Sequence, residues 1–188
     1  LFQNSASTGG GVETVQGTLR LFNSTVENNT ATTFSTGGVY AAVSDLLIVN
    51  STIVGNTTLD SAAGGVFFSS TGAQTGMIVD STIINNSANF GGGIVNRGNL
   101  TIIGSLIANN EADWAGGGIR SDFLSPTEPL TIINSTISGN RVLADTSAAT
   151  SGGGGLFLRG SGPATITNST IVDNRANISG TGANDGGG

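Results

Sequence analysis

The chain has 188 residues, of which 31 are glycine and only 10% are charged. Its formal net charge is −6, its six cationic residues are all arginine, and it contains neither cysteine nor histidine. This composition excludes disulfides, catalytic triads that need histidine and most zinc sites, and it lacks the concentrated basic face that binds nucleic acid. We therefore expect no cofactor, no metal and no nucleic-acid partner. No apolar run approaches the roughly 20 residues that span a bilayer.

A repeat extends along the chain. Alternating aliphatic residues followed by Asn-Ser-Thr and another aliphatic residue occur at 19–26, 46–53 and 130–137, and looser copies end at Ile83, Ile107 and Ile171. An asparagine stands three residues after each final aliphatic position, and a glycine cluster with its own aliphatic residue comes next. These asparagines are Asn29, Asn56, Asn86, Asn110, Asn140 and Asn174. A period in the mid-twenties to mid-thirties is typical of solenoid architectures.

Each copy is predicted to form three short strands separated by corners. Leu19 and Leu21 alternate with Arg20 in the second strand, which is the period of two expected for a strand. Asparagine and glycine suit the corners because both tolerate left-handed backbone angles. In the second coil, Val39, Leu46, Ile48 and Ile53 are predicted to point inward.

The fold class predicted is all-β, a right-handed single-stranded parallel β-helix of about six coils. One repeat domain is expected over residues 1–188, as a segment of a longer chain or assembly, because both ends stop within a coil and lack the polar caps that solenoids need. When coils stack in register, the repeated asparagines can bond one another along the axis as a structural ladder. The spacings of leucine-rich repeats and of hexapeptide solenoids are missing.

The pairing of Gly-Gly-x-aliphatic with aliphatic-x-x-Asn resembles the repeat of chlamydial polymorphic outer-membrane proteins and related bacterial β-helix surface proteins. The resemblance covers nearly the whole chain. Here Val or Ile stands where that family favours phenylalanine before x-x-Asn. The resemblance implies a β-helix on the exterior of a bacterium, used for adhesion or as a passive stalk.

The most concrete binding surface predicted is a lateral interface. If Leu19 and Leu21 point inward, the neighbouring second-strand positions form an outward apolar patch, and such a patch usually marks a contact. Its residues are Phe22, Leu47, Val49, Met77, Val79, Ile103 and Ile133. Two alternatives stay open: these aliphatic residues turn inward beside the corner, or the loop at 121–129 covers them.

The remaining expectations concern partners and chemistry. Self-association, end to end or laterally, is the expected partnership, and host or environmental glycans are a further one, with Tyr40 and Phe67 as aromatic contacts for sugar rings. A non-catalytic structural or adhesive module outside the cell is the favoured function.

The alternative is a polysaccharide lyase or glycosidase, because β-helices host both. Its candidate residues are Asp113, Asp122, Arg97, Arg120 and Arg159. Aligned coils place Arg97, Asp122 and Arg159 at one position of successive coils, where we expect an exposed ion-pair ladder and a cost of at most about 1 kcal/mol for Asp122→Ala.

Overall fold

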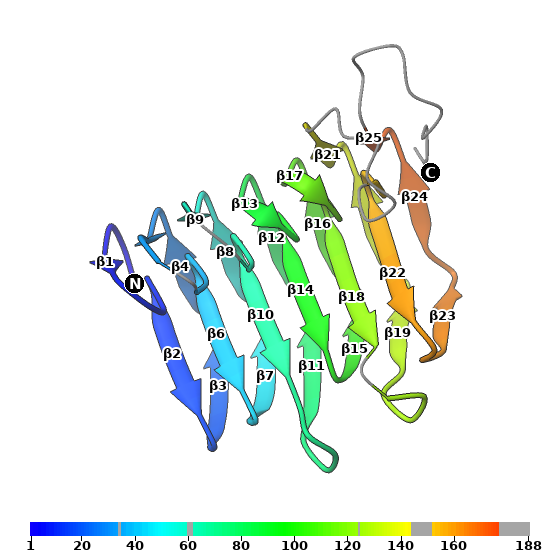
Figure 1. Ribbon diagram of the computed structural model, residues 1–188, viewed down its shortest axis with the longest axis horizontal. Helices are drawn as coiled ribbons and strands as arrows, with labels where there is room; N and C mark the ends of the chain where they lie inside the picture. The colour runs from blue at the N-terminus through cyan, green and yellow to red at the C-terminus, as the bar shows by residue number, and fades with distance from the viewer. Residues whose placement is uncertain (34, 60–61, 124, 144–151, 177–188) are drawn as a thin grey trace.

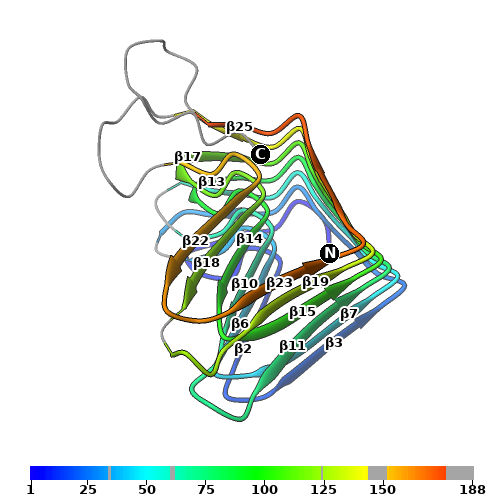
Figure 2. The ribbon, with the colours of Figure 1, turned by 90° about the vertical axis from the view of Figure 1, so that its right-hand side faces the viewer.

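The computed structural model describes residues 1–33, 35–59, 62–123, 125–143 and 152–176, and these form a solenoid built of strands and turns. The strands make four parallel sheets that run along the stack of coils. Three sheets have six strands and one has seven, in keeping with a stack of about six coils. Figure 1 shows the coils side by side, and Figure 2 looks along the stack. Within these residues, no helix is long and apolar enough to cross a membrane.

We number the sheets by their order along one coil. The first sheet contains β2 (Val12–Val15), β6 (Val39–Ala42), β10 (Val66–Ser69), β14 (Ile94–Arg97), β18 (Ile119–Phe123) and β22 (Leu156–Gly160). The second contains β3 (Thr18–Phe22), β7 (Asp45–Val49), β11 (Thr75–Val79), β15 (Asn99–Ile103), β19 (Leu130–Ile133) and β23 (Ala164–Thr167). The third contains β4 (Thr25–Glu27), β8 (Thr52–Val54), β12 (Thr82–Ile84), β16 (Leu106–Ala108), β20 (Thr136–Ser138) and β24 (Thr170–Val172).

The fourth sheet corrects the prediction of three strands per coil. It contains β1 (Ser5–Ala6), β5 (Thr30–Ala31), β9 (Thr57–Thr58), β13 (Ser87–Phe90), β17 (Glu111–Ala115), β21 (Arg141–Val142) and β25 (Arg175–Ala176). Most of these strands follow directly after a ladder asparagine, and several are only two residues long. Two residues cannot display an alternation of apolar and polar side chains, so this sheet leaves no period-two pattern in the sequence.

Aliphatic side chains from the first three sheets fill the interior. Val39, Leu46, Ile48 and Ile53 are at most 2% exposed, which confirms the prediction that they point inward. Equivalent positions align in register along the stack, so that Ile48 pairs with positions 21 and 78 of the neighbouring coils. Each fully buried aliphatic side chain contributes about 1.5–3 kcal/mol.

The six repeated asparagines lie at the corner between the third and fourth sheets, inside the solenoid. All six are buried, and each of the first five donates a hydrogen bond to the next one along the stack. In Asn56, for example, the backbone N and Nδ2 both donate to Oδ1 of Asn86, at 2.9 and 3.0 Å, and Nδ2 also donates to the carbonyl oxygen of Val26. The ladder thus satisfies polar groups that the core would otherwise leave unpaired.

The Asn-Ser-Thr phrase forms the corner between the second and third sheets. Its asparagine has left-handed backbone angles, with φ of 49° at Asn23 and 48° at Asn50. Its serine points inward: the backbone N of Ser51 donates to Oγ of Ser81 at 3.1 Å, and Oγ of Ser51 donates to the carbonyl oxygen of Val49 at 2.8 Å. Asp80 and Gly104 replace the asparagine in two coils and have φ of 46° and 59°, so a left-handed residue followed by an inward serine is what this corner requires.

The glycine clusters are explained by left-handed backbone angles at some positions and by close packing between coils at others. Gly91 and Gly116 have left-handed φ values of 56° and 66°, as the sequence predicts for corners. The glycines that follow them are needed because of close packing between coils: a Cβ atom on Gly92 would lie 2.3 Å from the carbonyl oxygen of Glu111. Only glycine therefore fits at that position without displacing the neighbouring coil.

Candidate functional site

The outer face of the second sheet brings together the residues predicted as a lateral interface. In successive coils, one column contains Phe22, Val49, Val79, Ile103 and Ile133, and Leu47 and Met77 lie in the adjacent column. We call these seven residues the apolar face. Burial alternates along β7 and β11, so the residues of the apolar face point away from the core. Phe22 is 51% exposed and Met77 38%, and the other five are half-buried.

Both alternatives to this surface can be compared with the structure. Inward-turning aliphatic residues are contradicted by the alternation of burial along β7 and β11. The described part of the loop at 121–129 approaches a different place: Oε1 of Glu128 lies 3.4 Å from the hydroxyl of Ser70, which follows directly after β10 in the first sheet.

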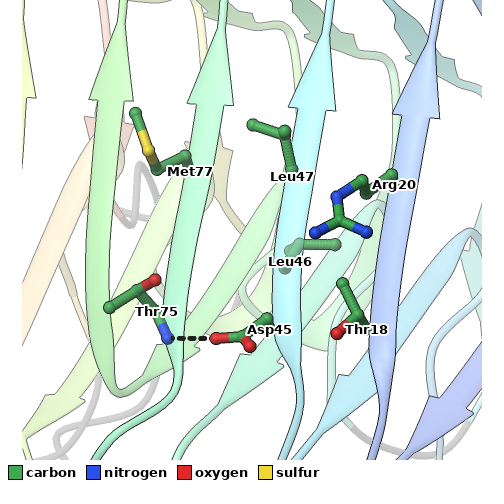
Figure 3. A pocket seen from close by; sticks show the side chains of 7 residues that line it. All are labelled: Thr18, Arg20, Asp45, Leu46, Leu47, Thr75 and Met77. Carbon is green, nitrogen blue, oxygen red and sulfur yellow. Dashed lines mark hydrogen bonds between the residues drawn. The ribbon is translucent and has the colours of Figure 1, made fainter.

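A pocket of about 280 Å³ opens beside the apolar face (Figure 3). It is lined by Thr18, Arg20, Asp45, Leu46, Leu47, Thr75 and Met77. Oδ1 of Asp45 accepts a hydrogen bond from the backbone N of Thr75 at 2.9 Å, which holds the carboxylate at the rim. Arg20 occupies the column of Leu47 and Met77. The pocket therefore combines an apolar wall with one cationic and one anionic side chain, the arrangement found at the polar rim of many interfaces.

The outer face of the first sheet holds the two predicted glycan contacts. The rings of Tyr40 and Phe67 stack with their centroids 4.9 Å apart and their planes 11° from parallel. Phe67, however, is only 6% exposed and packs with Ala63 and Val95. The guanidinium of Arg97, in the following coil, lies 5.6 Å from the centroid of the Phe67 ring. The prediction that Phe67 offers a free ring face to a sugar is therefore wrong, whereas Tyr40 is half-buried.

Charged residues on the same face form a cluster around the buried side chain of Asp122. The side chain of Asp122 is 3% exposed, and its Oδ2 accepts a hydrogen bond of 2.9 Å from Nε of Arg120. Nε of Arg97 lies 3.5 Å from Oδ2, and Nε of Arg159 lies 3.0 Å from Oδ1. The N–H of Arg159 is not aligned with Oδ1, so this contact is Coulombic and Oδ1 accepts no hydrogen bond.

Burial of Asp122 and Arg120 corrects the expectation of a fully exposed ladder, whereas Arg97 and Arg159 remain exposed. Arg120 is 7% exposed, and its guanidinium lies 4.3 Å from the centroid of the Phe90 ring and 5.8 Å from that of Phe157. Phe90 belongs to the fourth sheet, so a side chain from outside the first sheet covers the charges. The predicted alignment of Arg97, Asp122 and Arg159 is confirmed, and the predicted exposure of Asp122 is wrong.

Comparison with known proteins agrees with this geometry. A family model described as a right-handed β-helix region matches residues 3–187. The chain belongs to this right-handed β-helix family. The fold class predicted from the repeat is thereby confirmed. No curated protein and no solved structure matches the chain.

Four of the five enzymatic candidates lie together on the first sheet, and Asp113 lies apart from them. Asp113 is exposed on β17 of the fourth sheet, whereas Asp122 is buried on β18 of the first sheet. In the described residues, no three carboxylate, histidine or cysteine side chains gather to hold a metal ion. Because one fold hosts unrelated activities, membership of the β-helix family does not decide whether the chain is catalytic.

Several residues of these sites were missed by the interpretation of the sequence. Phe90 stands next to a glycine cluster and belongs to none of the repeated motifs, although its ring covers Arg120. Arg20 and Asp45 were not assigned to a site, although alignment of the second strands places Arg20 beside Leu47 and Asp45 beside Thr18. Aligning the second strands of all coils in register would have predicted that these residues lie together at the pocket.

Proposed function

We propose that this β-helix is a non-catalytic structural module whose apolar face binds a second copy of the chain side by side. The observation that supports this proposal is the alignment of apolar side chains over five successive coils of the second sheet. Soluble monomers rarely expose a continuous apolar patch larger than a few hundred Å². Removing such a patch from water contributes about 25 cal/mol per Å².

The column of the apolar face suits a two-fold contact between antiparallel stacks. In such a contact each copy presents the same patch, and residue pairs are exchanged across the axis. An axis at the central coil would place Val79 against its own copy, Val49 against Ile103 and Phe22 against Ile133. All of these pairs are apolar, and the charged rim at Arg20 and Asp45 stays at the edge of the contact.

We further propose that the module acts on the outside of a bacterial cell, where lateral pairs would build an adhesive or supporting layer that contacts surface glycans. The repeat's resemblance to bacterial β-helix surface proteins supports this location. Labelling intact cells with a membrane-impermeant biotin reagent tests it. The protein is expected among the labelled proteins, and its exclusive recovery from the unlabelled interior would contradict an external role.

Replacement of Val49 and Val79 by aspartate tests the lateral contact. The double variant places charges in the contact, so we expect it to sediment as a monomer at concentrations where the unmodified chain forms dimers or larger species. The matched control is Thr52→Asp with Thr82→Asp, which changes half-buried outward positions of the same two coils on the third sheet. Circular dichroism should show a folded β-helix in both variants.

Two outcomes would overturn the proposed contact. One is equal loss of association in the control, which would mean that added charge alone prevents assembly. The other is an unfolded Val49 and Val79 variant beside a folded control, which would place these side chains in the structural core.

The non-catalytic part of the proposal has a separate test. Incubation with neutral and acidic polysaccharides should produce no new reducing ends and no unsaturated products. Cleavage that is lost in Arg97→Gln and retained in Arg175→Gln would instead support the carbohydrate-active alternative, because Arg97 belongs to the Asp122 cluster and Arg175 lies exposed on β25.

A further inference from the structure

The cluster around Asp122 carries more positive charge than its own carboxylate can neutralise. Three guanidinium groups, those of Arg97, Arg120 and Arg159, surround one carboxylate, which leaves a local net charge of 3 − 1 = +2. Half of the six arginines of an acidic chain are gathered here. Within the described residues, Glu128 is the other buried carboxylate, and it forms no ion pair with these arginines.

The terminal nitrogens of the arginines remain available for a further anion. Each arginine makes its shortest contact with Asp122 through Nε. The side chain of Arg120 is only 7% exposed, and its buried Nη1 atom has no hydrogen-bond partner. A buried guanidinium N–H without a partner is costly, so it is an unusual feature for a purely structural cluster.

The electrostatics of Arg120 are consistent with this excess of positive charge. Burial lowers the pKa of Arg120, and the nearby charges of Arg159 and Arg97 lower it further. The hydrogen bond that Arg120 donates to Asp122, and the negative charge of Asp122, act in the opposite direction. The neighbouring arginines therefore repel Arg120, and a negative ligand would relieve that repulsion.

The geometry points to an oxyanion-binding site on the outer face of the first sheet, at which Arg97 and Arg159 donate hydrogen bonds to a sulfate or phosphate group above the buried Asp122–Arg120 pair. The side chains of Arg97 and Arg159 are 41% and 52% exposed, so solvent reaches them. Arginine presents a planar fork of donors that matches the oxygen atoms of such groups. A dianion would neutralise the local charge of +2.

The buried pair of Asp122 and Arg120 lies between the two exposed arginines of this site. Nε of Arg97 and Nε of Arg159 approach the Asp122 carboxylate from opposite neighbouring coils, so both guanidinium groups lie beside the same buried carboxylate. Arg97 also packs against the ring of Phe67, which restricts its side chain further. Such preorganisation lowers the entropy cost of binding an ion with flexible side chains.

Calorimetric titration of the folded chain with three probes tests the proposal. Inorganic sulfate, at constant ionic strength set with sodium chloride, tests the oxyanion alone, and a heparin-derived hexasaccharide tests the same group carried on a glycan. Uncharged maltohexaose is the neutral control. We expect sulfate to bind and maltohexaose not to bind. Tighter binding of the hexasaccharide than of sulfate would identify a sulfated glycan as the source of the anion, and equal binding would identify the free ion.

Substitutions then locate the site. Arg97→Gln and Arg159→Gln should each weaken sulfate binding about tenfold or more, because each removes a hydrogen-bonding charge from the anion. Arg175→Gln removes one exposed positive charge at β25 and should leave the affinity unchanged. Both test variants replace exposed side chains, and thermal unfolding confirms that they are folded. Absence of sulfate binding, or an equal loss in Arg175→Gln, would overturn the proposal.

Discussion

The outer faces of the first and second sheets start from the same alternation and end in different environments. On the second sheet, outward residues such as Met77 remain accessible to solvent. On the first sheet, the outward residues Phe67, Arg120 and Asp122 are buried, because side chains such as Ala63 and Phe90 pack over them. Alternation along a strand therefore predicts which side chains point away from the core. It does not predict which of these side chains are exposed to solvent.

This difference has an energetic consequence. A buried charge must be matched by partners in its immediate surroundings, whereas an exposed charge is solvated and screened. The buried outward charges of Arg120 and Asp122 on the first sheet should therefore matter for stability, and exposed outward charges such as Asp45 on the second sheet should matter little. The same contrast should hold for outward aromatic side chains.

The largest expected effect is that of Asp122→Ala on the first sheet. The substitution leaves Arg120 buried beside two other arginines without its carboxylate, so we expect the free energy of unfolding to fall by about 3–5 kcal/mol. Chemical denaturation monitored by circular dichroism measures this value. Asp45→Ala on the second sheet is the matched control, and it should cost at most about 1 kcal/mol because Asp45 is exposed. Similar values for the two variants would erase the distinction between the faces.

A smaller contrast is expected between two outward phenylalanines. Phe67→Ala removes a ring that is 6% exposed and packed between Tyr40 and Arg97, so it should cost about 3 kcal/mol. Phe22→Ala removes a ring that is 51% exposed and should cost about 1 kcal/mol or less in the monomer. Thermal unfolding of dilute protein provides the comparison. If Phe22→Ala proves the more destabilising change, the apolar face is packed within the monomer.

Much of the interior could be predicted from the sequence, because the interior repeats. Within each coil, the positions of Ile48, Ile53 and Asn56 keep the same spacing to one another, so the inward residues of one coil predict those of the others. The covering of the first sheet could not be predicted this way. It depends on Phe90 and on the residues near Ala63, which lie in segments that vary from coil to coil and carry no periodic pattern. The short strands of the fourth sheet escaped prediction for a different reason, because two residues cannot show a period of two.

The apolar face, unlike the covering of the first sheet, could be predicted from the sequence. Its seven residues belong to the repeated second strand, so their common orientation follows from the period of two, and the structure places them together. The pocket beside them depends on single residues, Arg20 and Asp45, that occur in only one coil each. A repeat cannot predict features that it does not repeat.

Chemical crosslinking at Val79 tests the proposed lateral contact most directly. The chain contains no cysteine, so a single introduced cysteine reacts without background. Facing sheets lie about 10 Å apart, which exceeds the reach of a disulfide, so a bismaleimide reagent of similar length is the appropriate probe. Val79→Cys should yield a covalent dimer, since an antiparallel contact centred on the third coil places Val79 against its own copy. Ile84→Cys, which points outward from the third sheet in the same coil, should remain monomeric. Equal crosslinking of the two variants, or none at Val79 while the chain is associated, would contradict the account.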